Sequence, residues 1–269
     1  MNQGNDLRGD YSHINDDYTI DQDWSTYTEA EHELWRKLYD RQSRILPGYA
    51  AEDYIRNLMK LDASDQIPHF GRVSEKLHAA TGWHLVAVPG LVPDDVFFDH
   101  LANRRFPVTV WLRKPEEMDY LVEPDIFHDF FGHVPMLYDP TFADYLAAYG
   151  AKGPEAIAMG GLKQLARMYW YMVEFGLIMT PHGLRAYGAG MLSSQTETIY
   201  SVTDPTPTVP ETLREDSVVD CGPAFLQPMP PMGIYETLYA FQAAFGEPMG
   251  EVGTHPWSQG YPRTEQIPG

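Results

Sequence analysis

A chain of 269 residues in which 43% of the side chains are hydrophobic is long enough to bury one large core or two small ones. Its net charge of −19, from 38 acidic and 19 basic residues, argues against nonspecific binding to nucleic acid or anionic membranes, because both attract positive charge. The sequence has no apolar run of the roughly 18 residues that a membrane helix needs, no secretory signal at its acidic N-terminus, and one cysteine, Cys221. An intrachain disulfide and an all-thiolate metal site are thereby excluded, and we expect a cytoplasmic protein without a nucleic-acid or membrane partner.

The first part of the chain is predicted to be an acidic arm followed by helices. Residues 1–23 contain six aspartates and no sustained periodicity, which indicates a mobile arm. Thr28 and Glu31 have the spacing of a capping box, and apolar residues then recur at helical spacing until Pro47 ends the pattern. Amphipathic patterns predict two further helices, over residues 50–61 and 74–81.

From Trp83 onward, strands are predicted between helices. The strands are expected over 83–91 and 106–113, and the helices over 93–105, 140–150, 161–179 and 232–245. The proline-rich stretch 203–231 is predicted to be a loop. The simplest account is a mainly α fold with small β elements (α+β), with one domain over 24–245 and an irregular tail over 246–269.

Two histidines five residues apart, His128 and His133, mark the sequence "PDIFHDFFGHVP". On a regular α-helix their side chains would point about 140° apart. Gly132 can leave helical geometry without steric cost, and Pro135 disfavours helix at the residue before it. We therefore expect the helix to loosen at Gly132, so that His133 lies on the turn leaving it and swings back beside His128.

Glu174 is a carboxylate in the middle of an apolar helical stripe, whose other members are Ala166, Trp170, Val173 and Leu177. Burying a carboxylate costs free energy unless positive charge compensates it. Arg167 could provide that charge, which is the purely structural explanation. A divalent cation held together with the two histidines would compensate better, so these three residues are candidate metal ligands.

Two histidines and one carboxylate suit zinc hydrolases and non-haem iron(II) oxygenases alike. Zinc proteases place their histidines four apart with a glutamate after the first, whereas this chain has a spacing of five, and Asp129 follows His128. The pattern therefore favours iron(II), although a zinc hydrolase stays open. A metal-stabilised binding protein would need a closed coordination shell, and no fourth ligand is evident.

Several long motifs in register resemble the catalytic domain of the pterin-dependent aromatic amino acid hydroxylases. They are "EPDIFHDFFGHVP", "YWYMVEFGL", "AYGAGMLSS" and "TGWHLVAVPGLVPDDVFFDHLANRRFPV", and the resemblance runs from about Trp24 to Phe245. It is strongest to short bacterial members that hydroxylate phenylalanine. It implies Fe(II) bound by His128, His133 and Glu174, with no catalytic residue beyond this metal site, and a tetrahydropterin (tetrahydrobiopterin or similar) that reduces dioxygen so that L-phenylalanine becomes L-tyrosine.

The resemblance also implies roles in holding the pterin. Phe97 matches the aromatic residue that stacks on the pterin ring. The backbone of Gly90, Leu91 and Val92 matches the loop that faces it, although the serines of the vertebrate loop are missing here. Asp129 replaces a glutamate of the animal enzymes and is expected to reach the pterin.

For the small-molecule aromatic amino acid, Arg113 matches the arginine that binds the carboxylate, and Asp125 is expected to orient it. The remaining substrate-site matches are Trp170, Phe175, Gly190 and Ser193. From helical spacing alone, Trp170 would instead be a core residue. Tyrosine or tryptophan hydroxylation stays open as an alternative. Because the chain shows neither the regulatory domain nor the tetramerisation helix of the vertebrate enzymes, we expect a monomer.

Overall fold

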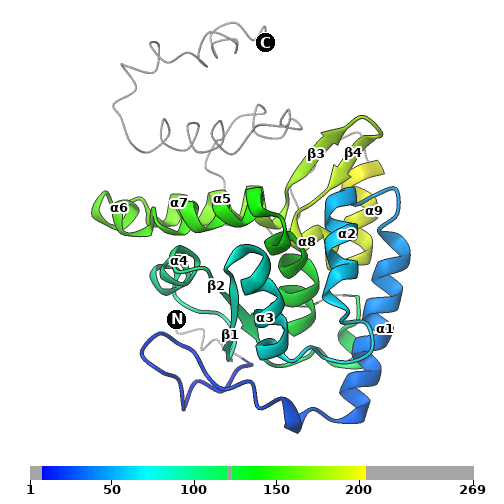
Figure 1. The fold of residues 1–269 in the computed structure, drawn as a ribbon, viewed down its shortest axis with the longest axis horizontal. Helices are drawn as coiled ribbons and strands as arrows, with labels where there is room; N and C mark the ends of the chain where they lie inside the picture. The colour runs from blue at the N-terminus through cyan, green and yellow to red at the C-terminus, as the bar shows by residue number, and fades with distance from the viewer. Residues whose placement is uncertain (1–7, 120, 122, 204–269) are drawn as a thin grey trace, which may run out of the picture. The chain divides into compact units, whose positions relative to one another are not determined.

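Helices dominate the computed structural model, which describes residues 8–119, 121 and 123–203 (Figure 1). The helices are α1 Glu29–Ile45, α2 Glu52–Leu61, α3 Phe70–Thr81, α4 Asp94–Ala102, α5 Pro140–Gly150, α6 Gly153–Ala158, α7 Leu162–Tyr169, α8 Ala189–Leu192 and α9 Gln195–Thr203. The strands are β1 His84–Val88, β2 Arg105–Thr109, β3 Leu177–Thr180 and β4 Gly183–Ala186. The class predicted from the sequence, mainly helical with small β elements, is confirmed.

Local signals in the sequence determine where the first three helices begin and end. The Thr28 hydroxyl accepts from the Glu31 amide at 3.3 Å, and the Glu31 carboxylate accepts from the Thr28 amide at 2.8 Å, so the predicted capping box forms and α1 follows it. Helix α2 also lies where it was expected. Helix α3 begins at Phe70, four residues before the predicted start, and ends as predicted at Gly82, whose φ of +78° is left-handed.

A β1–α4–β2 unit forms one small sheet. The two strands are parallel, with His84 opposite Arg105 and Val88 opposite Thr109. Both are shorter than predicted. Helix α4 connects them and packs against α5. The chain between β1 and α4, residues 89–93, is therefore held at both ends by regular structure.

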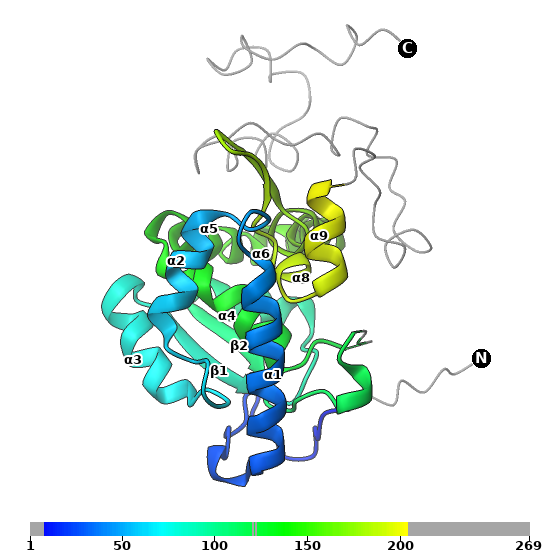
Figure 2. The same ribbon diagram turned by 90° about the vertical axis from the view of Figure 1, so that its right-hand side faces the viewer.

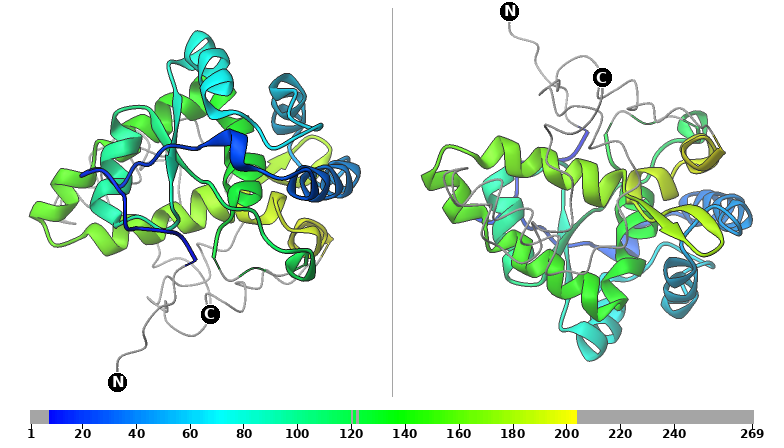
Figure 3. Two further views of the ribbon diagram at one scale, coloured as in Figure 1. Left: turned by 90° about the horizontal axis from the view of Figure 1, so that it is seen from below. Right: turned by 90° about the horizontal axis from the view of Figure 1, so that it is seen from above.

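The N-terminal segment lies along this sheet, as Figure 3 shows for the dark blue part of the chain. The Ile20 amide donates to the Ala87 carbonyl at 2.9 Å, and Asp17 pairs with Arg105 at 3.1 Å. The Tyr11 hydroxyl donates to the Leu91 carbonyl at 2.9 Å. Residues 8–23 thus contact the fold over their length. The mobility predicted for residues 1–23 and the domain boundaries at 23 and 245 stay predictions.

An aromatic cluster joins α1 and α2 to the histidine motif. Trp35 contacts Phe127 edge-on at 5.5 Å between ring centroids, Tyr39 contacts Phe131 at 5.2 Å, and Phe127 and Phe131 stack at 4.8 Å. Tyr54 is fully buried against Phe131. The motif is therefore fixed to the core through its phenylalanines.

The predicted helix over 161–179 is wrong in its last part. Helix α7 ends at Tyr169 and a π turn continues it to Glu174, whereas residues 177–180 form β3, which pairs antiparallel with β4. The Gly176 carbonyl accepts from the amides of Tyr187 and Gly188 at 3.0 and 2.9 Å. Because that carbonyl is bonded to a distant segment, the chain leaves the helix there.

Helix α9 closes this half of the fold beside the C-terminal end of α1 (Figure 2). The buried Gln42 amide of α1 donates to the Thr198 hydroxyl of α9 at 2.8 Å. Within the described ranges, no helix is long and apolar enough to cross a membrane. The predicted loop 203–231 beyond Thr203, the helix 232–245, the tail 246–269 and Cys221 lie outside the described residues.

The crossing of α4 and α5 yields a test of packing. A Cβ on Gly150 would lie 2.4 Å from the Ala102 amide nitrogen and 2.5 Å from the Leu101 Cβ. We expect Gly150→Ala to destabilise the protein by about 1–3 kcal/mol, because neither helix can move without disturbing the core. The measurement is urea unfolding followed by circular dichroism.

The matched control is Gly71→Ala on the exposed face of α3, where the added methyl meets only the His69 ring. Its stability should be unchanged or slightly higher, since alanine favours helix over glycine. Equal stability of the two variants would contradict the tight crossing.

Candidate metal centre

Each of the three candidate ligands lies at the end of a π turn. His128 and His133 are the first and last residues of the π turn His128–His133, and Glu174 is the last residue of the π turn Trp170–Glu174. A π turn closes its hydrogen bonds between residues five apart, so residues at that spacing come onto one face. This corrects the expectation that the helix loosens at Gly132. The helix widens instead, and the spacing of five is the spacing that the widened turn requires.

Pro135 and a buried tyrosine account for the first π turn. Pro135 has no amide hydrogen, so it cannot donate to the Phe131 carbonyl four residues earlier. The Tyr54 hydroxyl donates to that carbonyl in its place. Gly132 allows the widened turn to lie against α8, because a Cβ there would be 2.8 Å from the Ala189 carbonyl oxygen.

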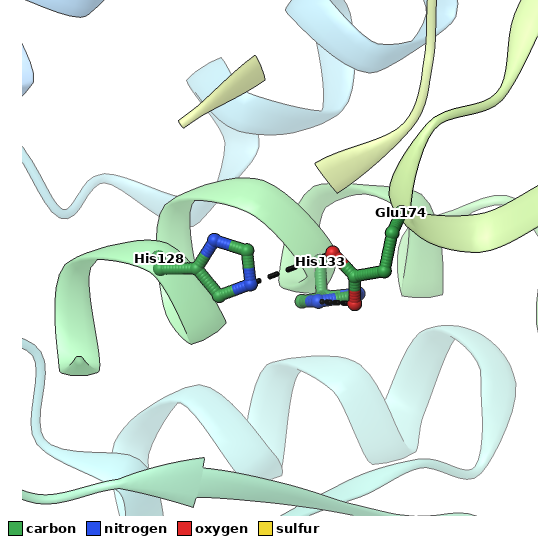
Figure 4. Close-up of side chains that lie close together, drawn as sticks. All are labelled: His128, His133 and Glu174. Atoms are coloured by element: carbon green, nitrogen blue, oxygen red, sulfur yellow. Dashed lines mark ion pairs between the residues drawn. The ribbon is translucent and has the colours of Figure 1, made fainter. Parts of the chain in front are cut away.

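The three side chains point toward one another, as Figure 4 shows. His133 Nε2 lies 2.9 Å from Glu174 Oε1, and His128 Nε2 lies 3.5 Å from Glu174 Oε2. Their ligand atoms all lie within 4.8 Å of one another. With metal–ligand bonds of roughly 2.0–2.2 Å, neighbouring ligand atoms are expected about 3 Å apart. The geometry therefore fits a single ion bound at the three atoms.

The charge state of the cluster also suits a cation. Burial opposes ionisation of Glu174, but His133 and His128 outweigh it and hold the pKa of the carboxyl far below its usual value. Burial likewise disfavours protonated His128, yet the hydrogen bond and charge of Glu174 raise its pKa overall. The buried carboxylate is thus stabilised by the two imidazoles beside it, and a divalent cation bound at the same three side chains would supply further compensating charge. Arg167, the alternative partner, forms no ion pair with Glu174 within the described part of the chain.

Ser193 fixes the orientation of the His128 ring. The Ser193 hydroxyl donates to the Ala189 carbonyl at 2.9 Å, and His128 Nδ1 lies 2.8 Å from the same oxygen. Since the hydroxyl proton is already used, Nδ1 must carry the hydrogen and donate it to Ser193. Nε2 is then the nitrogen that faces Glu174 and would bind a metal after losing any hydrogen it carries.

A cavity opens in front of the triad and contains every residue predicted to face a pterin. Its lining includes His128, His133, Glu174, Gly90, Leu91, Val92, Phe97, Asp129 and Trp170. Asp129 accepts from the Thr109 amide at 2.8 Å, and burial raises the pKa of its carboxyl. Among the described residues, no acceptor is found for the amides of Leu91 and Val92. Those two amides are therefore available to a bound molecule.

Arg113 and Asp125 form a buried pair at the start of the histidine turn. Arg113 Nε and Nη2 donate to the two Asp125 oxygens at 2.9 and 2.8 Å, and the side chains are 6% and 0% exposed. Asp125 also accepts from the His128 amide at 2.9 Å. The arginine is therefore held in one orientation and connected through Asp125 to the start of the π turn.

The remaining substrate candidates surround Glu174. Trp170 stacks with Phe175 at 6.0 Å, and it is 44% exposed, which corrects the core position that helical spacing alone would assign to it. A Cβ on Gly190 would lie 3.3 Å from Glu174 Oε2, so the glycine allows close approach of backbone to the carboxylate. Arg113, Asp125, Phe175, Gly190 and Ser193 do not line the cavity in the region that the structure describes.

Sequence reasoning missed two contributors to the site, Tyr169 and Phe106. Tyr169 stacks beside His133, with its hydroxyl 3.4 Å from Nδ1, and its ring meets Phe97 edge-on at 5.0 Å. Phe106 covers the His133 ring at 4.9 Å. The only available signal for Tyr169 was its place beside Trp170, and a regular helical projection assigns it to a different face from Glu174.

Comparison with known proteins agrees with this geometry. The model of the biopterin-dependent aromatic amino acid hydroxylase family matches residues 6–229, most of the chain. The chain belongs to this family. Proteins similar to it include the phenylalanine-4-hydroxylase of Caulobacter vibrioides, 61% identical over 192 residues, and that of Chromobacterium violaceum, 56% identical over 197 residues.

Solved structures of the Chromobacterium hydroxylase have the same fold. One with bound iron and phenylalanine matches with a TM-score of 0.69 at 55% identity, covering 73% of this chain and 71% of that one. Another, with iron(III) and 7,8-dihydrobiopterin, matches with a TM-score of 0.71 at 56% identity, covering 73% and 72%. The curated relatives are matched over 71% and 73% of this chain but over 65% and 66% of their own lengths, just under two thirds.

The hydrogen bond between Ser193 and His128 yields a test of the metal centre. We expect Ser193→Ala to weaken Fe(II) binding about 10- to 100-fold, because the His128 ring loses the acceptor that fixes its orientation. The affinity is measured anaerobically by competition with a chelator. Ser201→Ala in α9 is the control, since among the described residues that hydroxyl contacts the Thr198 carbonyl alone, at 3.4 Å. Equal affinities in the two variants would contradict the assigned role.

Proposed function

We propose that this protein hydroxylates L-phenylalanine to L-tyrosine, using dioxygen and a tetrahydropterin such as tetrahydrobiopterin, at Fe(II) bound by His128, His133 and Glu174. The observation that carries the proposal is the triad's position at the wall of a cavity that also contains Phe97 and the loop 90–92. The iron, phenylalanine and dihydrobiopterin bound in structures of the similar Chromobacterium hydroxylase support it.

The donor set fits Fe(II). Two imidazoles and one carboxylate on one side of an ion leave its other positions open, which is the arrangement of non-haem iron oxygenases. Among the described residues, this is the one cluster of three such side chains. The open side faces the cavity, so other molecules can reach the ion. A closed structural site, as in a metal-stabilised binding protein, is disfavoured by the same observation.

The pterin side of the cavity offers stacking and hydrogen bonding. Phe97 presents its ring to the cavity and is held in place by Tyr169. The amides of Leu91 and Val92 would donate to a bound pterin ring, and the Tyr11 hydroxyl fixes this loop by donating to the Leu91 carbonyl. Asp129, fixed by the Thr109 amide, lines the same cavity and would offer its carboxyl group to the pterin.

The amino-acid side uses Arg113 and the aromatic pair. Asp125 occupies Nε and Nη2 of Arg113, so Nη1 is the nitrogen left to bind the substrate carboxylate. Trp170 and Phe175 bound the space for the aromatic ring near Glu174. When bound, iron and tetrahydropterin supply the activation of dioxygen, and the protein positions both substrates and excludes water.

We further propose that the protein works as a cytoplasmic monomer, with a catalytic domain over 24–245. The acidic net charge and the absence of an apolar run in the sequence support the cytoplasmic location. The resemblance of the motifs to short bacterial hydroxylases supports the monomeric state and the extent of the catalytic domain. Tyrosine and tryptophan remain alternative substrates of the same site.

Restoring single metals to the metal-free protein tests the proposal. With L-phenylalanine, tetrahydropterin and oxygen, tyrosine should form with Fe(II) and not with Zn(II), as followed by chromatography. Parallel reactions with tyrosine and tryptophan measure selectivity. No product from any of the three, in folded and iron-loaded protein, would refute the proposed function, and the zinc sample would then be screened for hydrolysis.

Two glutamate variants are matched controls for that experiment. Glu174→Ala should lose more than about 100-fold in iron affinity and nearly all turnover, because it removes a ligand. Glu155→Ala, which removes a surface ion pair with Lys152, should behave as the unmodified protein.

Arg113→Lys tests the amino-acid site. Lysine cannot reproduce the planar pair of bonds to Asp125 together with a third bond to substrate, so the KM for phenylalanine should rise about 10-fold or more. The KM for tetrahydropterin should change little. Arg105→Lys, at the start of β2, is the control. An unchanged phenylalanine KM in Arg113→Lys would remove this arginine from the site.

A further inference from the structure

We propose that Arg41, on α1, is a positioning residue for the carboxylate of the amino-acid substrate. The inference rests on the proposed function, because it takes Arg113 to be the group that binds this carboxylate. Arg41 acts through the main-chain carbonyl of Met118, which lies beside the nitrogen of Arg113 that Asp125 leaves unpaired.

The unpaired nitrogen of Arg113 has one weak contact. Nε and Nη2 donate to Asp125 at 2.9 and 2.8 Å, which are ordinary distances for a charge-assisted bond. Nη1 contacts the Met118 carbonyl oxygen at 3.4 Å, at the outer limit of a hydrogen bond. Nη1 therefore keeps most of its donor capacity for an incoming carboxylate.

The Met118 carbonyl is instead held by Arg41. Arg41 Nη2 donates to it at 2.6 Å, and Nη1 pairs with Asp119 at 2.6 Å. Asp119 is 82% exposed, so this ion pair contributes little to stability. The Arg41 side chain is 24% exposed, and no acceptor is found for its buried Nε within the described residues. A buried donor without an acceptor costs free energy, so the hydrogen bonds of the two Nη atoms must offset that cost for the side chain to lie here.

The Met118 carbonyl thus accepts a short hydrogen bond from Arg41, at 2.6 Å, and only a long one from Arg113, at 3.4 Å. This difference affects how the substrate carboxylate can bind to Arg113. Without Arg41, the Met118 carbonyl would be free to approach Arg113 Nη1 and to accept one of its two hydrogens more closely. The substrate carboxylate would then compete with a main-chain acceptor for the same nitrogen. Because the hydrogen bonds of Arg41 in the described structure go to Met118 and Asp119 alone, pterin binding at the loop 90–92 should not change.

The test compares ligand binding to the anaerobic, Fe(II)-loaded protein by calorimetry, without turnover. Arg41→Met removes the donors and keeps much of the apolar stem. We expect it to weaken L-phenylalanine binding about 10-fold and to leave 7,8-dihydrobiopterin binding unchanged. Arg41→Lys keeps one donor group, so its affinity for L-phenylalanine should lie between those of the unmodified protein and Arg41→Met. The control is Arg44→Met on the same helix, where the side chain is 77% exposed and pairs with Asp40.

Each outcome decides the inference. Phenylalanine binding that is equal in Arg41→Met and Arg44→Met would overturn it, and so would parallel loss of phenylalanine and dihydrobiopterin, which would indicate a general structural role. If Arg41→Met does not fold, Arg41→Lys provides the same comparison. Failure of the unmodified protein to bind any aromatic amino acid would instead refute the proposed function, and the inference with it.

Discussion

The ion pairing of a buried glutamate with two imidazoles is the interaction around which this fold is organised. Glu174 is 6% exposed and next to the buried Val173, so its charge must be compensated nearby. The compensating groups come from a turn some forty residues earlier in the chain, and they reach the carboxylate only because both segments widen into π turns. Helix α8 then completes the site, since Ser193 orients His128 and Gly190 leaves room beside the carboxylate.

The hydrophobic core holds the histidine turn in place from the opposite side. Phe130 and Phe131 of the turn are fully buried, and Phe131 packs against Tyr39 and Tyr54 of the first two helices. A rotation of the turn would expose these rings as well as move the histidines. The free energy that keeps the metal ligands together is therefore largely that of core packing, which explains how a site with few direct contacts between its ligands is preorganised before a metal binds.

Local signals in the sequence predicted the parts of this structure that depend on local interactions. The capping box of Thr28 predicted α1, and the apolar periods predicted α2, α4 and both strands of the parallel pair. The proximity of His128 and His133 was expected, but from a helix that loosens, whereas it comes from a turn stabilised by Tyr54. That contact joins residues 77 apart, so no local pattern could indicate it. The same limit explains Trp170: a projection with 3.6 residues per turn fails where the turn is wider, and it assigned this exposed side chain to the core.

The π turns have a consequence for how such a site can be gained or lost. A π turn is an α-helix with one residue inserted, so deletion of a single residue between His128 and His133 would restore regular helical geometry over this stretch. The two histidines would then be four residues apart, a spacing that a regular α-helix already places on one face. What such a deletion would remove is one of residues 129–132, and each of them has a place of its own: Phe130 and Phe131 are fully buried, Asp129 accepts from the Thr109 amide, and Gly132 lies against α8. The additional residue of the π turn therefore lets one short segment present both histidines and also the side chains that fix it to the core and the cavity. A one-residue deletion there would damage the packing around the site, although every ligand residue would still be present in the sequence.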